Sequence, residues 1–143
     1  MNPDPDSNSP TPPRLIDPAA SVLIIEDDEI NAMIVDEQLG MLDISSERCC
    51  NGQLGLERWR EQSFQLILMD ISMPVMGGLE ATAAIRAEEK ATQRPRTPII
   101  AVTANAESHM RNKCMEVGMD DVLPKPIRLD PLSTCLQPYL NIG

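Results

Sequence analysis

The sequence predicts a single α/β domain, a doubly wound parallel β-sheet with helices on both of its faces. Short apolar runs of strand length alternate along the chain with segments of helical character, five times in succession. The runs are apolar throughout rather than at alternate positions, which is typical of strands that are covered on both faces. A chain of 143 residues with 42% apolar residues is long enough for one core of this kind.

The first strand and helix are predicted from an apolar run that is followed by an acidic turn. Val22–Ile25 is the run, and the acidic residues after it stand where the dipole of a helix start favours negative charge. Ile30, Met33 and Ile34 then recur at helical spacing. Residues 44–49 form a weaker strand candidate, which would open the second unit.

The central part of the chain continues the alternation. Residues 52–62 are predicted to form a helix, and residues 65–69 are the apolar run of the central strand, which stops at Asp70. An alanine-rich segment from residue 79 to about residue 90 predicts the next helix. Residues 91–97, which include a proline, are expected to form a loop.

The last part of the chain supplies two more strand–helix units. Residues 98–102 read as another buried strand. An apolar stripe from Ala106 to Val117 predicts a helix that ends at Gly118. Residues 121–123 are predicted to form a short strand and residues 128–140 the final helix.

Residues 1–19 differ in composition from the rest of the chain, because prolines are interleaved there with Asp, Asn and Ser. Such a composition cannot bury a core, so we expect a flexible tail or linker before a domain that covers residues 20–143. The apolar runs are too short for a membrane-spanning helix and the N-terminus lacks the features of a signal peptide, which favours the cytoplasm. A net charge of -10 argues against binding to nucleic acid or to anionic membranes.

Polar residues end four of the predicted strands. Glu26 and Asp27 follow the first strand, Asp70 the third, Thr103 the fourth and Lys125 the fifth. The carboxyl ends of parallel strands meet at one edge of a sheet, so these side chains are expected to surround one point. Each alone has an ordinary explanation, such as a helix cap, a turn or a solvated lysine. Together, carboxylates beside an ammonium and a hydroxyl suit the binding of Mg²⁺ and the transfer of a phosphoryl group.

Four sequence blocks, in this order, resemble the receiver domain of two-component response regulators, and most closely the receivers of hybrid histidine kinases. The blocks are IIEDDEIN (Ile24–Asn31), LILMDISMPVMGGLEAT (Leu66–Thr82), PIIAVTANA (Pro98–Ala106) and GMDDVLPKPI (Gly118–Ile127). The resemblance covers the chain from about residue 20 to its end. It implies a five-stranded parallel sheet in the order 2-1-3-4-5, flanked by five helices.

The resemblance also implies a metal site and an acceptor. Asp70 would accept the phosphoryl group. Mg²⁺ is the implied cofactor, and Asp27 and Asp70 would ligate it, with Glu26 binding directly or through water. The backbone carbonyl of Ser72 would complete the protein ligands.

The remaining site residues implied by the resemblance are Thr103, which would bond one phosphoryl oxygen, and Lys125, which would pair with another. The Lys125–Pro126 peptide would be cis. The implied function is a phosphorylation-activated receiver whose donor is a phosphohistidine of a histidine kinase or a histidine phosphotransfer protein. Its output would be binding to a downstream protein or onward transfer in a phosphorelay. Such a domain is not an enzyme with a separate substrate, since it catalyses only its own phosphotransfer and dephosphorylation.

Other functions are left open by the residues. A pseudo-receiver keeps the fold and binds partners without phosphorylation, and Val122 favours it because many receivers carry Tyr or Phe at this position. A phosphatase of the haloacid dehalogenase type also uses Asp, Thr, Lys and Mg²⁺, but it needs a D-x-D motif where this chain has Glu26-Asp27-Asp28. No Ser/Thr/Gly-rich phosphate loop follows the first strand, which argues against a flavodoxin-like electron carrier.

Overall fold

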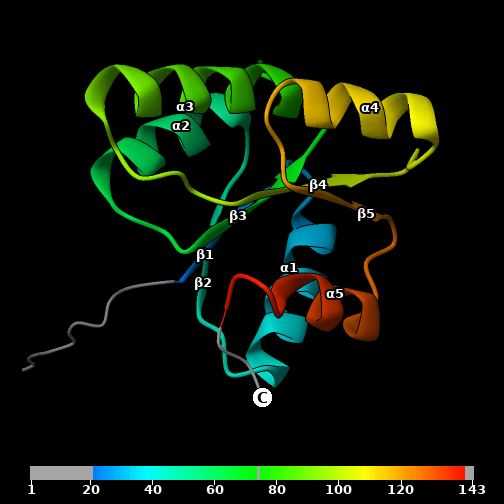
Figure 1. The fold of residues 1–143 in the computed structure, drawn as a ribbon. Coiled ribbons are helices and arrows are strands. Elements are labelled where there is room, and N and C mark those ends of the chain that lie inside the picture. Colours follow the sequence, from blue (N-terminus) through cyan, green and yellow to red (C-terminus); the bar gives the residue numbers. More distant parts are fainter. Residues whose placement is uncertain (1–20, 74, 141–143) are drawn as a thin grey trace, which may run out of the picture.

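A computed structural model describes residues 21–73 and 75–140, and the predicted tail, residues 1–19, lies outside these ranges. Within them five strands alternate with five helices, as the sequence predicts (Figure 1). The strands are β1 (Val22–Ile25), β2 (Ser46–Cys49), β3 (Leu66–Asp70), β4 (Ile99–Thr103) and β5 (Asp121–Pro124). The helices are α1 (Glu29–Met41), α2 (Gly52–Glu61), α3 (Gly78–Thr92), α4 (Ser108–Glu116) and α5 (Leu129–Leu136). None of these helices has both the length and the apolar character that crossing a membrane requires.

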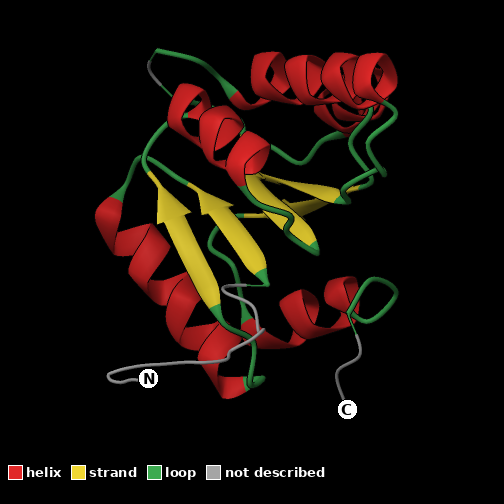
Figure 2. Cartoon of the chain, turned by 90° about the vertical axis from the view of Figure 1, so that its left-hand side faces the viewer, coloured by secondary structure: helices red, strands yellow, loops and turns green. Residues whose placement is uncertain are grey.

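The sheet has the predicted topology. All of its strand pairs are parallel, and the strand order is β2-β1-β3-β4-β5. Figure 2 shows the sheet between two layers of helices. Helices α1 and α5 cover one face, and α2, α3 and α4 cover the other (Figure 1). Because each strand is followed by a helix that returns the chain to the same end of the sheet, the carboxyl ends of all five strands lie at one edge.

Each face of the sheet has its own apolar core. Strand β1 shows the division: Val22 and Ile24 contribute to the core under α1 and α5, while Leu23 and Ile25 contribute to the core under α2 and α3. None of these four side chains is more than 3% exposed. Successive side chains of a strand point to opposite faces, so a strand buried on both sides must be apolar at every position. That requirement produces the continuous apolar runs of the sequence.

The first helix lies where it is predicted, but its most prominent apolar residues do not face the core. The buried residues of α1 are Ala32, Val35 and Leu39. The three residues whose spacing predicts the helix are exposed: Ile30 at 68%, Met33 at 64% and Ile34 at 43%. Both stripes have helical spacing, so periodicity identifies the helix without showing which stripe packs on the sheet. The outward stripe is an apolar surface that the core does not use.

The last helix is shorter than predicted, because it ends at Leu136 rather than Leu140. Pro138 explains the difference, since a proline has no N–H to donate and its ring clashes with a preceding helical turn. The backbone N–H groups of Tyr139 and Leu140 both donate to the Leu136 carbonyl, in a turn beyond the helix. The other predicted boundaries agree with the observed ones to within two residues, and those of β1 are identical.

Gly78 is a position where we expect a side chain to be harmful, because α3 begins directly against the end of β3. A Cβ atom on Gly78 would lie 2.3 Å from the carbonyl oxygen of Asp70 and 3.0 Å from the Cα atom of Ile71. These are backbone atoms, which can move aside only if the strand end moves. Gly78→Ala should therefore lower the free energy of unfolding by about 2 kcal/mol or more. Urea denaturation, followed by the fluorescence of the buried Trp59, measures the change.

Gly40→Ala is the matched control for this experiment. Gly40 lies within α1, and a Cβ atom there would meet no atom within 4 Å. This substitution should raise the free energy of unfolding by up to about 1 kcal/mol, because alanine favours helix more than glycine does. Equal effects of the two substitutions would show that the close approach of α3 to β3 does not limit stability.

Candidate functional site

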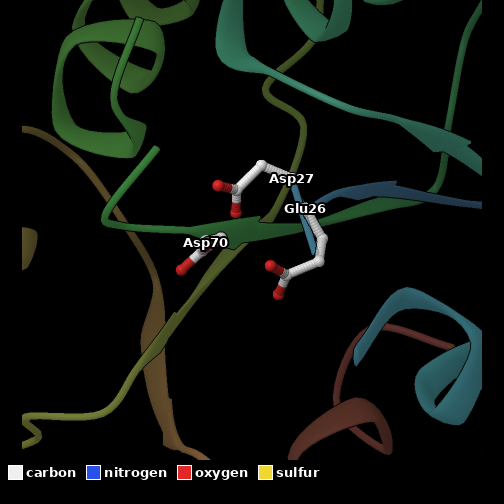
Figure 3. Close-up of side chains that lie close together, drawn as sticks. All are labelled: Glu26, Asp27 and Asp70. Atoms are coloured by element: carbon white, nitrogen blue, oxygen red, sulfur yellow. The ribbon is translucent and has the colours of Figure 1, made fainter. Parts of the chain in front are cut away.

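Three carboxylates lie together at the carboxyl edge of the sheet. Glu26 and Asp27 follow β1 and Asp70 ends β3, and Figure 3 shows the three side chains turned toward a common space. One carboxylate oxygen from each residue lies within 4.8 Å of those of the other two. Glu26 and Asp70 are buried, at 4% and 3% exposure, whereas Asp27 is exposed. The parallel pairing of β1 with β3 therefore brings together side chains that are more than 40 positions apart in the sequence.

Asp28, the third acidic residue after β1, caps a helix and does not belong to the group of three carboxylates. Asp28 is the N-cap of α1, and its Oδ1 accepts hydrogen bonds from the backbone N–H groups of Ile30 and Asn31, at 2.9 and 3.1 Å. The backbone N–H of Asp28 in turn donates to the Glu26 carboxylate at 3.1 Å. The helix start thus occupies the Asp28 side chain and leaves those of Glu26 and Asp27 to face Asp70.

Lys125 brings a positive charge to the buried carboxylates. Its Nζ lies 3.1 Å from Oδ1 of Asp70 and 3.3 Å from Oε1 of Glu26. The backbone N–H of Lys125 donates to the Thr103 carbonyl at 2.8 Å, which anchors the end of β5 to β4. The Lys125–Pro126 peptide is cis, as expected.

Thr103 and Ser72 lie at the same edge of the sheet, but in the described part of the chain no hydrogen bond joins their side chains to the three carboxylates. Thr103 is buried, and its hydroxyl accepts a hydrogen bond from the Asn105 N–H at 3.0 Å and donates one to the Asn105 carbonyl at 3.2 Å. Ser72 is an exposed residue of the turn that follows β3. Within residues 21–73 and 75–140, neither side chain is hydrogen-bonded to Asp70. The roles expected of Thr103 and Ser72 stay predictions.

Burial shifts the pKa values of the charged groups in this site. Burial, reinforced by the nearby Asp70 carboxylate and opposed by the Asp28 N–H, raises the pKa of Glu26 to about 7. Burial also raises the pKa of Asp70, although the contact with Lys125 acts in the opposite direction. For Lys125, burial disfavours the charged form, but the contacts with Asp70 and Glu26 outweigh it and raise the pKa. Burial thus works against the charged form of all three groups, and only for Lys125 do the contacts with opposite charges outweigh it.

This chemistry fits a hard divalent cation. Carboxylate oxygens are the protein ligands that Mg²⁺ prefers, and Mg²⁺ usually keeps several waters beside one or two of them. Oδ2 of Asp70 is buried and has no hydrogen-bond partner in the described part of the chain, which is unfavourable for a polar atom. A cation bound by Glu26, Asp27 and Asp70 would satisfy this oxygen and reduce the repulsion between the carboxylates.

Arg48 is a residue of this edge that no sequence pattern marks. It lies in β2, and its guanidinium group donates hydrogen bonds to the backbone carbonyls of Glu26 and Asp27, both at 3.0 Å. A motif could not reveal this contact, since it depends on the register of a weakly predicted strand beside β1.

The sequence matches the family described as response regulator receiver domain over residues 22–137. Among curated proteins, hybrid signal transduction histidine kinase G of Dictyostelium discoideum is 41% identical over 120 residues, which cover 82% of this chain and 3% of that protein. Peroxide stress-activated histidine kinase mak1 of Schizosaccharomyces pombe is 36% identical over 124 residues, which cover 85% of this chain and 8% of that protein. The chain thus spans less than a tenth of the length of either relative.

Two solved structures are similar in fold and sequence. One is the receiver domain of Ssk1 of Saccharomyces cerevisiae, crystallised with the histidine phosphotransfer signaling protein Ypd1. Its TM-score is 0.77 at 34% identity, over 87% of this chain and 94% of that chain. The other is the receiver domain of sensor histidine kinase PA1611 of Pseudomonas aeruginosa PAO1, with a magnesium ion in its active site cleft. Its TM-score is 0.75 at 34% identity, over 85% of this chain and 98% of that chain.

The raised pKa of Glu26 leads us to expect a loss of stability with pH in buffer without divalent cations. The ordinary pKa of this group is 4.5, and in the folded protein it is about 7. As the pH rises between these values, the unfolded chain gives up its proton before the folded protein does, so the folded state becomes relatively less stable. Across this range the wild type should lose on the order of 2 kcal/mol relative to Glu26→Gln, and it should lose no more at higher pH.

Urea denaturation of both proteins at a series of pH values measures this difference. With Mg²⁺ present the trend should reverse, because the cation binds the ionised carboxylates of the folded state. A difference between wild type and Glu26→Gln that stays constant with pH, in buffer without divalent cations, would contradict the raised pKa.

Proposed function

This chain belongs to the response regulator receiver family, and on that premise we propose that Asp70 accepts a phosphoryl group from a phosphohistidine of a histidine kinase or a histidine phosphotransfer protein. The observation that supports this most strongly is the setting of Asp70. It is a buried carboxylate at the end of the central strand, with Lys125 Nζ 3.1 Å from it and two further carboxylates beside it. A carboxylate with a purely structural role would gain nothing from two acidic neighbours, which repel it.

In the proposed transfer, a carboxylate oxygen of Asp70 attacks the phosphorus of the phosphohistidine. The new P–O bond forms as the P–N bond breaks, and the imidazole nitrogen keeps the electron pair of the broken bond. The phosphoryl group later leaves by hydrolysis of the acyl phosphate or by transfer to another histidine. The chain thus acts only on its own phosphorylation state.

Two side chains would stabilise the negative charge that spreads over the oxygens of the phosphoryl group during transfer. Lys125 keeps its ammonium charge, because its contacts raise its pKa, and it can pair with a phosphoryl oxygen as well as with the carboxylates. Thr103 can donate its hydroxyl to a second phosphoryl oxygen in exchange for its longer contact, the one to the Asn105 carbonyl at 3.2 Å.

Mg²⁺ is the proposed cofactor. Glu26, Asp27 and Asp70 would hold it, together with the backbone carbonyl of Ser72. When bound, Mg²⁺ supplies positive charge beside the phosphoryl oxygens. The magnesium ion in the similar PA1611 receiver supports this assignment.

The phosphohistidine donor is proposed to dock on the α1 patch, which consists of the exposed residues Ile30, Met33 and Ile34. The patch adjoins the site, since Ile34 lines a small hollow that it shares with Glu26 and Lys125. A protein that delivers a phosphohistidine to Asp70 must cover this edge of the sheet, and the burial of three apolar side chains would favour its binding. The crystallisation of the similar Ssk1 receiver with a phosphotransfer protein supports a partner of this kind.

The output is proposed to be binding to a downstream protein or onward transfer. Val122 is buried and lies beside Ala101 in the sheet, and a valine side chain is stiff. A buried valine does not reach the surface, so a change at Thr103 would be passed on through the hydrogen bonds between the Thr103 hydroxyl and the exposed Asn105. We place these reactions in the cytoplasm, in keeping with the four free cysteines of the chain.

Intact mass spectrometry tests the acceptor. After incubation with acetyl phosphate and Mg²⁺, the wild type should gain one phosphoryl group, about 80 Da. Asp70→Asn should gain none, because an amide is not a nucleophile of this kind. A wild type that is folded and binds Mg²⁺ but gains no mass would support the pseudo-receiver instead, and an adduct that persists in Asp70→Asn would place the acceptor elsewhere.

Substitution in the α1 patch should separate donor docking from chemistry. Met33→Lys puts a charge into the patch and should slow transfer from a phosphorylated histidine phosphotransfer protein by about tenfold, while the rate with acetyl phosphate stays within about twofold. Met115→Lys is the matched control, because Met115 is a methionine of α4 that is 47% exposed. Equal slowing by both variants, or slowing by neither, would show that the donor docks elsewhere.

A further inference from the structure

Arg48 joins the edge strand β2 to the acidic turn after β1. Arg48 pairs with Ile24 in the parallel register of these strands, so its side chain starts near the end of β1. The guanidinium group reaches past the end of β1, where Nε donates to the Glu26 carbonyl and Nη2 to the Asp27 carbonyl, both at 3.0 Å. One planar group thus binds two successive peptide units.

These two carbonyls lie in a gap between regular elements. The backbone pairing of β1 with β2 ends at the bond from the Glu26 N–H to the Cys49 carbonyl, at 3.0 Å. The backbone bonding of α1 starts at the Asp28 carbonyl, which accepts from the Ala32 N–H at 3.0 Å. The carbonyls of Glu26 and Asp27 each accept a hydrogen bond from Arg48, and no other residue in the ranges 21–73 and 75–140 donates to them. The turn that carries the two acidic side chains is therefore tied to the sheet by Arg48.

Asp27 depends on this tie more than the other carboxylates do. Asp70 lies within a strand and contacts Lys125, and Glu26 is buried and accepts a hydrogen bond from Asp28. The Asp27 side chain is exposed, and within the described ranges no hydrogen bond or ion pair holds it. Its direction follows from the conformation of its own peptide unit, whose carbonyl Arg48 binds.

We infer that Arg48 is a positioning residue for the divalent-cation site, an inference that rests on the proposed function. By fixing the peptide units of Glu26 and Asp27, it holds their carboxylates in the direction of Asp70 before a cation arrives. Groups that orient metal ligands in this way typically change metal affinity by about tenfold or more when they are removed. The contacts of Arg48 are to the backbone of the turn, so Arg48 would act on the cation through the carboxylates of Glu26 and Asp27.

The charge of Arg48 and its two hydrogen bonds would have opposite effects on the affinity for Mg²⁺. A guanidinium near the site repels an incoming cation, so the loss of its charge alone would strengthen Mg²⁺ binding. The loss of its two hydrogen bonds would weaken binding. Lysine separates the two effects, because it keeps the charge but cannot reproduce the planar pair of donors.

The test is titration of the ¹⁵N-labelled chain with Mg²⁺, followed by the amide signals of Asp27 and Asp28. Arg48→Met should raise the dissociation constant about tenfold, and Arg48→Lys should raise it at least as much, because lysine loses the planar donor pair but keeps the charge that repels the cation. Arg60→Met is the matched control, because Arg60 is an α2 residue with a 47% exposed side chain paired to Glu88. It removes the same charge and should leave the dissociation constant within about twofold.

Thermal unfolding without Mg²⁺ shows whether each variant is folded, and if Arg48→Met is not, Arg48→Lys decides. An unchanged or lower dissociation constant in the Arg48 variants, with the wild type binding Mg²⁺, would overturn the positioning role and leave the proposed function intact. A wild type that does not bind Mg²⁺ would overturn both.

Discussion

The constraint on which the site depends is the crowding of three carboxylates beside one ammonium at the end of a buried sheet. Two unit charges about 4 Å apart near a protein surface interact by about 4 kcal/mol, so such a cluster is costly without a cation. Burial adds to this cost, and it is the main cause of the raised pKa values of Glu26 and Asp70. In the proposed function, a phosphoryl group would add negative charge to the same place. The site would then depend on a divalent cation, because Lys125 alone supplies too little positive charge for the three carboxylates and the phosphoryl group.

Contacts to the backbone hold the elements that carry this cluster in place. Parallel pairing puts the ends of β1 and β3 side by side, and the absence of a Cβ atom at Gly78 lets α3 begin against the end of β3. The Lys125 N–H is fixed to β4 through the Thr103 carbonyl, and Arg48 closes the gap between β1 and α1. The last two contacts fix peptide units that carry charged side chains, so losing either of them should weaken the proposed cation binding before it unfolds the domain.

The sequence predicts the sheet well because the central strands β1, β3 and β4 are buried on both faces, which leaves a nearly continuous apolar signal in each of them. The edge strands β2 and β5 are less buried and give a weaker signal. The sequence predicts the helix α1 without showing its inward face, since Ala32, Val35 and Leu39 compete with a larger apolar stripe. Helix α5 ends early because of Pro138, whereas the prediction followed the apolar pattern, which continues to Leu140. The strand order, which the sequence predicts, brings Glu26, Asp27, Asp70 and Lys125 to one edge of the sheet. Arg48 could not be predicted, because its role exists only in the register of β2 beside β1.

Borohydride trapping tests the central claim most directly, because it reports the acceptor residue and the dependence on the cation together. Reduction of an aspartyl phosphate converts the aspartate to homoserine, which peptide mass spectrometry locates in the chain. After incubation with a phosphodonor, we expect homoserine at position 70 when Mg²⁺ is present and none when it is chelated. Homoserine at another position, or equal yields at position 70 with and without Mg²⁺, would contradict the account of a cation-dependent acceptor at Asp70.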